Sequence, residues 1–119
     1  MAAKIISTLI DFETPHYVSV NDRYFRKGVG LSTKWKDKTK LFRAQVSELW
    51  DRPALEYENL IFEACVPFSF DWDNLGKFFC DGMEGIVYAN DKQILRGTIE
   101  RRPVLRTARV VVHVGRLIK

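Results

Sequence analysis

The stretch Asp71-Trp72-Asp73-Asn74-Leu75-Gly76-Lys77 places two carboxylates two residues apart and a lysine four residues after the second. In an extended backbone, residues two apart project to the same side, so Asp71 and Asp73 are expected to face one point. Apolar residues then recur at helical spacing, which predicts a helix with Asp73 or Asn74 as its N-cap. A strand, a carboxylate pair and a helix start together predict a site for Mg²⁺, which binds few protein carboxylates and keeps water or phosphate oxygens as its other ligands.

Each part of this stretch also has a purely structural interpretation. An Asp before a helix is most often only its N-cap, and Asp73 with Lys77 has the i,i+4 spacing of a weak surface ion pair. A calcium-binding EF-hand loop is excluded. Counted from Asp71, its fifth and twelfth positions would be Leu75 and Gly82, which have no side-chain oxygens.

The size and composition of the chain predict one packed domain. With 46% hydrophobic and 13% aromatic residues, the 119 residues (1–119) are expected to fold as a single unit with its own core. Cys65 and Cys80 form neither a metal-ligand pattern nor a disulfide framework, which favours a reduced, cytoplasmic setting, in a cell or for a phage-encoded protein. No apolar run approaches the ~20 residues of a membrane-spanning helix, and no segment is typical of a signal peptide, so no membrane partner is expected.

The net charge of +4 conceals a segregated pattern. Residues 48–91 contain ten acidic and two basic residues. The segments on both sides are basic: residues 92–119 contain eight basic residues and one acidic residue, and residues 34–43 contain five basic residues and one acidic residue. A metal-dependent enzyme acting on a polyphosphate would show this arrangement, with acids for the cation and basic segments for the backbone. Arginines that coat the outer face of a strand pair would show it equally well.

Hydrophobic periodicity predicts an α+β domain, with helices packed on one side of a small mixed β-sheet. Strands are expected over residues 4–12, 57–67, 94–102 and 105–117, with helices from Ser32 or Thr33 to about Trp50 and from Asn74 to Gly82 or Gly85. The first helix is amphipathic, and its apolar face is expected to hold Trp35, Phe42, Val46, Leu49 and Trp50.

Shorter signals lie between and within these elements. Residues 86–89 are expected to be extended, Asn90-Asp91 to form a turn and a second helix cap, and Pro103 to make a tight link between the last two strands. In the last strand His113 alternates with inward-pointing valines, so we expect a partly buried strand residue and not a catalyst.

Two motifs carry a family resemblance: Asp71-x-Asp73-Asn74-Leu75-x-Lys77-x-x-x-Asp81, and then Asn90-Asp91-x-Gln93-Ile94. Together with Asn21-x-Arg23-Tyr24-x-Arg26 and the basic helix around Arg43, they make the chain resemble the RusA-like Holliday junction resolvases from roughly Asn21 onward. The chain departs from that family at two places. Phe68-Ser69-Phe70 stands where members often carry a basic run, and Asn90 stands where they often carry the first of two aspartates.

The resemblance implies a small homodimeric endonuclease that binds four-way DNA junctions and cuts two strands symmetrically with Mg²⁺, or Mn²⁺ in its place. Carried over to this chain, it makes Asp71, Asp73 and Asp91 metal ligands and Lys77 the essential lysine. Phosphate contacts are expected from the basic residues Arg23, Arg26, Lys34, Lys36, Lys38, Lys40, Arg43, Arg101, Arg102, Arg106 and Arg109.

Apolar residues that a small sheet would leave uncovered are candidates for the subunit interface, with ordinary core packing as the alternative: Trp50, Phe68, Phe70 and Trp72. Two other functions remain open. The first is a non-catalytic nucleic-acid-binding module in which the acids are structural. The second is a metal-dependent nuclease for flaps, replication forks or RNA.

Overall fold

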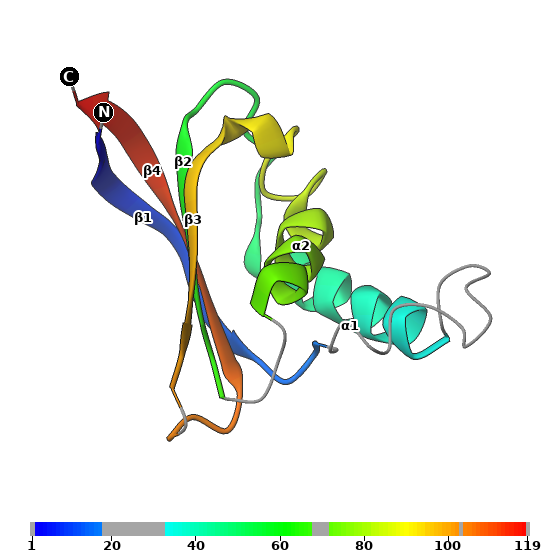
Figure 1. Cartoon of the computed structure of the whole chain (residues 1–119). Coiled ribbons are helices and arrows are strands. Elements are labelled where there is room, and N and C mark those ends of the chain that lie inside the picture. Colours follow the sequence, from blue (N-terminus) through cyan, green and yellow to red (C-terminus); the bar gives the residue numbers. More distant parts are fainter. Residues whose placement is uncertain (1, 18–32, 68–71, 103, 119) are drawn as a thin grey trace.

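The computed structural model describes residues 2–17, 33–67, 72–102 and 104–118, with the backbone alone at residues 33–34 and 72–75. Its elements follow in the order β1 (Ala2–Thr14), α1 (Thr33–Leu49), β2 (Leu60–Val66), α2 (Trp72–Met83), a short 3-10 helix η2 (Asp91–Gln93), β3 (Ile94–Arg101) and β4 (Ala108–Ile118). Both helices lie on one side of the sheet (Figure 1), which confirms the predicted α+β class.

The four strands form one mixed sheet in the order β1-β4-β2-β3. β4 pairs antiparallel with both β1 and β2, whereas β3 pairs parallel with β2. The expected tight link between β3 and β4 does not make them neighbours, because β2 lies between them. Parallel pairing of β2 and β3 needs a crossover connection, and α2 provides it.

The core lies between the sheet and the two helices. Alternate residues of β2 face it, as predicted: Leu60, Phe62, Ala64 and Val66 are all buried. The ring of Phe42 in α1 lies 5.4 Å from that of Phe79 and 5.6 Å from that of Phe78, between centroids. Aromatic packing at these distances joins α1 to α2 and fixes the layer of helices against the sheet.

The end of α1 differs from the prediction at one residue. Leu49 is 49% exposed, because it falls outside the buried stripe that Phe42 and Val46 occupy. Trp50 is buried, with its indole N–H donating to the carbonyl of Pro53, so the core alternative holds for this interface candidate. Phe68 and Phe70 lie outside the described residues, as does the side chain of Trp72.

The segment after α2 is a turn rather than the expected extended piece. Gly85 has φ of 87°, a left-handed conformation that glycine adopts without strain, and it lies two residues after Met83, the last helical residue. The fully buried Tyr88 then forms isolated bridges with Leu55 and Glu84, and its hydroxyl donates to the carbonyl of Cys80. This turn brings the chain back to the start of β3.

Both cysteines are free thiols, in line with the expectation of a protein without disulfides. Burial raises the pKa of the Cys80 thiol to about 12. Among the described residues, neither helix is long and apolar enough to span a bilayer.

Candidate active site

Helix α2 carries most of the motif residues, and its packing explains which of them face solvent. Phe78, Phe79 and Met83 are buried against the sheet and α1, so the opposite face of the helix carries Lys77 and Asp81. Gly82 lies directly against the ring of Phe42, where an added Cβ would collide with ring carbons. The face of α2 that carries Gly82 therefore packs closely against α1, and this contact fixes the orientation of the helix.

The start of α2 corrects the predicted local geometry of the carboxylate pair. The helix begins at Trp72, so Asp73 and Asn74 lie inside its first turn and neither precedes it as an N-cap. The argument from an extended backbone therefore does not apply to Asp73. Asp71 lies outside the described residues, and for Asp73 the structure gives the backbone alone.

Lys77 lies on the exposed face of α2, one turn beyond Asp73. Its side chain is 50% exposed, and its Nζ lies 3.4 Å from Oδ2 of Asp81. Exposed i,i+4 pairs of this kind contribute about 0.3–0.5 kcal/mol, so little holds the ammonium in place. The Lys77 side chain can therefore turn toward an anion at low cost.

The other end of α2 is held by contacts from distant parts of the chain. Nη1 of Arg43 in α1 donates to the carbonyl oxygens of Asp81, Gly82 and Glu84, at 3.3, 3.1 and 3.0 Å. These carbonyls have no partner within the helix, and a cation at a helix C-terminus also opposes the helix dipole favourably. Arg43 was expected to contact phosphate, but its guanidinium is engaged inside the fold.

Asp91 is exposed at the start of η2, and two sets of hydrogen bonds fix its backbone. Its N–H donates to Oε2 of Glu84 at 3.1 Å. Asn90 caps η2, as predicted: its side chain accepts from the N–H of Lys92, and Gln93 completes a capping box. These bonds use the backbone of Asp91 and leave its carboxylate facing solvent.

The structure does not bring Asp91 close to the start of α2. Figure 1 shows η2 beside the C-terminal end of the helix, whereas Asp73 lies in its first turn. Within the described part of the chain, no three Asp, Glu, His or Cys side chains are grouped so that they could hold one metal ion. The predicted convergence of Asp71, Asp73 and Asp91 stays a prediction, since Asp71 and the Asp73 side chain are not described.

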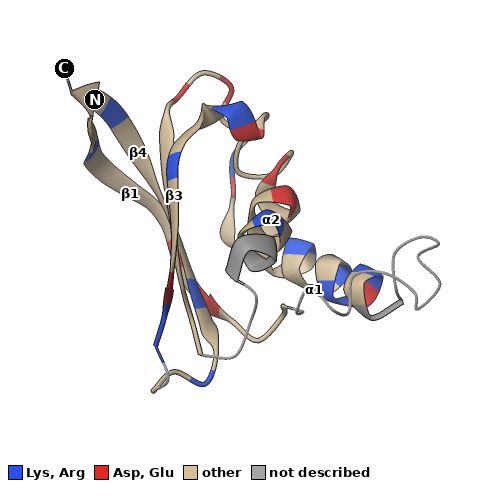
Figure 2. Ribbon diagram, viewed as in Figure 1, with Lys and Arg blue, Asp and Glu red and all other residues tan. Residues whose placement is uncertain are grey.

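The expected phosphate-binding residues fall into groups with different surroundings. Lys36 and Lys40 are exposed on α1, Arg101 is exposed at the end of β3, and Arg106 is exposed in the β3–β4 connection. Figure 2 shows basic residues along α1, both a basic and an acidic residue on α2, and acids in the segment between α2 and β3. Lys38 is partly buried, Arg23 and Arg26 lie outside the described residues, and the structure gives only the backbone of Lys34.

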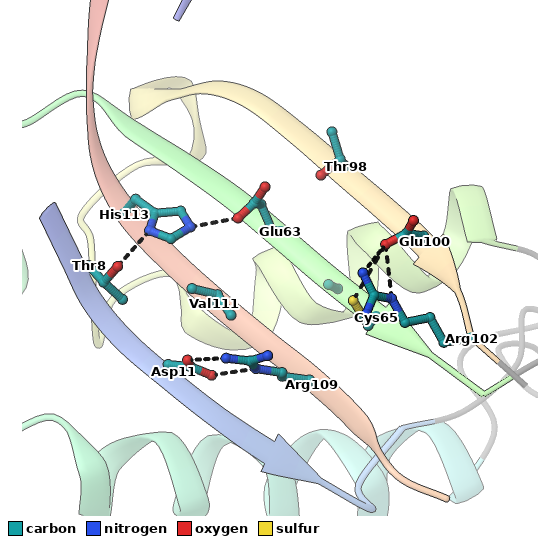
Figure 3. Close-up of a pocket in the computed structure, with 11 residues that line it drawn as sticks. Thr8, Asp11, Glu63, Cys65, Thr98, Glu100, Arg102, Arg109, Val111 and His113 are labelled. Atoms are coloured by element: carbon teal, nitrogen blue, oxygen red, sulfur yellow. Dashed lines mark hydrogen bonds and ion pairs between the residues drawn. The ribbon is translucent and has the colours of Figure 1, made fainter. Parts of the chain in front are cut away.

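Arg102 and Arg109 are engaged in ion pairs on the sheet face opposite the helices (Figure 3). Arg109 binds Asp11 through two hydrogen bonds, one of them 2.8 Å from Nε to Oδ1, and this contact lowers the pKa of the Asp11 carboxyl. Arg102 binds Glu100, with 2.8 Å between Nη2 and Oε2. A phosphate contact from either arginine would have to compete with a carboxylate.

The same face contains a pocket of about 340 Å³ in which His113 is buried. Thr8 Oγ1 lies 2.9 Å from Nδ1 of His113, and Glu63 Oε1 lies 2.6 Å from its Nε2. His113 is thus a buried strand residue, as predicted. Alternation along β4 indicated the face of the sheet on which the His113 side chain lies. Its partners come from β1 and β2, and which residues they are depends on strand register, which the sequence did not indicate.

One positioning residue, Glu84, was missed, and another, Arg43, was predicted in a different role, as a phosphate contact. Glu84 gave no signal beyond being one of several acids, and its role appears only once the turn at Gly85 brings Asp91 to its carboxylate. Arg43 is one of several basic residues in α1, and only the packing of α1 on α2 shows that its role differs from theirs.

Comparison with known families defines the class. Residues 34–115, well over half of the chain, match the model of an endodeoxyribonuclease family, so the protein is a DNA-cleaving hydrolase. That family is the endodeoxyribonuclease RusA family, and the chain belongs to it, which confirms the resemblance drawn from the two motifs. The matched range contains Asp71, Asp73, Lys77 and Asp91. No curated protein matches the chain.

Proposed function

We propose that the protein is a divalent-metal-dependent endonuclease that binds four-way (Holliday) DNA junctions as a homodimer and cuts two strands symmetrically, in recombination and repair. The observation that carries this proposal is the RusA family match over residues 34–115, which spans both acidic motifs and the lysine between them. The charge distribution supports it, since basic residues lie along α1 and the acids Asp81, Glu84 and Asp91 lie at the end of α2 and between it and β3.

The donor set suits a hard cation such as Mg²⁺ or Mn²⁺. Asp71, Asp73 and Asp91 would hold it, because carboxylate oxygens are preferred ligands of Mg²⁺, and the carboxylate of Asp91 faces solvent. When bound, the cation would neutralise charge at the scissile phosphate and activate a water molecule.

Lys77 would supply the second source of positive charge. Among the described residues its ammonium pairs with Asp81 in a weak surface ion pair, and from the first half of α2 it would donate to the phosphoryl oxygens as their charge builds. A single electrostatic stabiliser of this kind typically contributes about a hundredfold in rate.

Exposed basic residues on α1 and beside the β3–β4 connection would contact the DNA backbone, among them Lys36, Lys40, Arg101 and Arg106. Such contacts position the protein without reading sequence, and they weaken steeply as salt rises. A homodimer fits the substrate, because a four-way junction has near two-fold symmetry and an isologous dimer presents two equivalent sites.

A panel of end-labelled substrates tests the function: four-way junctions, flaps, forks and linear duplexes, each with Mg²⁺ or with EDTA. We expect paired, symmetric cuts in the four-way junction with Mg²⁺ only, and none from Asp73→Asn, which should bind the junction as well as the wild type or better. Equal cleavage of flaps or forks would favour the broader branched-DNA nuclease, and cleavage by Asp73→Asn would show that the metal site is assigned to the wrong residues. Binding that no Mg²⁺ converts into cleavage would favour the non-catalytic module.

A further inference from the structure

The connection between β3 and β4 forms a hydrogen-bonded turn at one end of the sheet. The N–H of Leu105 donates to the carbonyl of Arg102 at 3.0 Å, and the N–H of Arg102 donates at 2.8 Å to the carbonyl of Val66, the last residue of β2. The guanidinium of Arg102 is held in turn by Glu100, with 2.8 Å between Nη2 and Oε2. These contacts fix the direction in which the turn projects from the sheet.

Val104 lies inside this turn, between the two residues that the first hydrogen bond joins. It is 89% exposed, the highest value for a large apolar side chain among the described residues. A single exposed apolar residue is ordinary on a protein surface, so the argument depends on what surrounds it. Residues 100–106 contain three arginines and one acid, a net charge of +2, and Arg101 and Arg106 are exposed. An apolar side chain on a fixed turn between cations suits DNA, whose charged backbone encloses stacked bases.

The turn lies near the part of α2 that carries Lys77. A Cβ added at Gly76 would lie 2.9 Å from Cδ1 of Ile99, and Ile99 precedes Arg102 by three residues. Three residues of strand span about 10 Å, which is the length of about three base-pair steps of a duplex. Figure 1 shows the connection (orange) at the end of the sheet opposite to η2. A strand bound near Lys77 would therefore come within reach of the turn.

We propose that the β3–β4 turn opens the DNA at the crossover of a four-way junction, with Val104 inserted between two bases and Arg101 and Arg106 on the flanking phosphates. The inference rests on the proposed function, in which the protein binds such a junction. An apolar side chain that enters a base step unstacks it, and contacts with the deformed DNA offset the cost. Bases that are already poorly stacked cost less to open, so insertion favours the crossover over a continuous duplex.

The opposite end of the sheet offers a matched comparison. Tyr57, which is 88% exposed, lies in the connection between α1 and the start of β2. Its neighbours in sequence are the acids Glu56 and Glu58, whose charge repels phosphate. Of these two side chains, Val104 is the one whose surroundings attract DNA, and Tyr57 serves as the control.

Fluorescence of 2-aminopurine measures the opening directly. This base replaces adenine at each position next to the crossover of a four-way junction, and protein is added in EDTA so that no strand is cut. We expect the fluorescence to rise severalfold at one of these positions with the wild type and with Tyr57→Ser. It should stay near the level of the free junction with Val104→Ser, although this variant should bind with an affinity within about twofold of the wild type, because the phosphate contacts remain. Val104→Leu, with a longer apolar side chain, should retain the rise.

Cleavage gives a second readout, which a merely structural role of Val104 would not produce. With Mg²⁺, Val104→Ser should cut a fully paired junction about tenfold more slowly than the wild type, because it no longer offsets the cost of unstacking. It should cut a junction with mismatched bases at the crossover at nearly the wild-type rate, because those bases are already open. An equal loss on both junctions would overturn the role of Val104.

The outcomes separate this inference from the proposed function. A wild type that binds and cuts the junction without any rise in fluorescence would overturn the opening by Val104 and leave the nuclease standing. A rise that Val104→Ser retains in full would do the same. If the wild type neither binds nor cuts four-way junctions, the proposed function fails and this inference fails with it. Circular dichroism checks that each variant is folded.

Discussion

The two ends of helix α2 differ in how their residues are held. In the first half of the helix Lys77 is half exposed, and among the described residues it is held by a weak ion pair with Asp81. At its end, Arg43 from α1, the Tyr88 hydroxyl and the Glu84 carboxylate hold the helix and the turn that leads to Asp91. The first end is suited to move toward a substrate, and the second to keep an acid in place.

The largest effect is expected for chemical labelling of Cys80, which measures how firmly the C-terminal half of α2 is held. Cys80 lies in the second half of α2, and its pKa of about 12 makes its thiolate fraction at pH 8 about a thousandfold lower than that of an ordinary cysteine. We expect iodoacetamide to label Cys80 slower by that order than a short unfolded peptide with the same sequence. Mass spectrometry of the digested protein over time gives the rate, and labelling at the peptide's rate would show that this end of the helix opens readily.

Removal of the Lys77 charge tests the mobile end. Lys77→Met should lower the single-turnover cleavage rate about a hundredfold, because one electrostatic stabiliser of the reacting phosphate is lost. Its unfolding free energy should change by less than about 0.5 kcal/mol, since only a surface pair is removed. Lys4→Met, an exposed substitution on β1, is the matched control and should cleave like the wild type. Equal rates for the two variants would contradict the role of Lys77.

Glu84→Gln tests the fixed end. The amide retains an acceptor for the Asp91 N–H but lacks the charge, so Asp91 should be held less firmly. We expect a loss of about tenfold in cleavage at low Mg²⁺, the usual scale for residues that orient a metal ligand. Saturating Mg²⁺ should restore most of it, whereas Glu84→Ala should recover less. A loss that Mg²⁺ does not relieve would point to a role for Glu84 outside the positioning of Asp91.

Arg43→Met gives the smallest expected effect and separates a structural arginine from a DNA-binding one. Loss of its bonds to three carbonyls should cost about 1–3 kcal/mol in urea unfolding. Lys40→Met, on the exposed part of the same helix, should leave stability nearly unchanged and reduce the slope of log binding constant against log salt by about one. If Arg43→Met reduces that slope instead, its guanidinium contacts phosphate.

The sequence predicted the elements of the fold well because local patterns determine them. Alternation in β2 and in β4 gave the buried faces, and Asn90 forms the helix cap that the Asn90-Asp91 pair indicated. Strand order was not predictable in the same way. β2 takes the place between β3 and β4 through long-range pairing, which no short segment specifies.

The sequence names the residues of the candidate site, which stay a prediction, whereas it does not indicate their geometry. The motif from Asp71 to Lys77 indicated the chemistry, and the family match agrees with it. Where Asp91 lies relative to Asp73 depends on the length of α2 and on the parallel pairing of β2 and β3. Those features emerge only from the assembled fold.

Iron-mediated cleavage of the protein itself tests most directly whether Asp73 and Asp91 serve one metal ion. Fe²⁺ bound in place of Mg²⁺, with ascorbate and peroxide, cuts the backbone near its ligands, and the fragments are mapped by mass spectrometry. Our account predicts cuts near both residue 73 and residue 91 that excess Mg²⁺ suppresses together and that Asp73→Asn abolishes together. Cuts near residue 91 that persist unchanged in Asp73→Asn would contradict it.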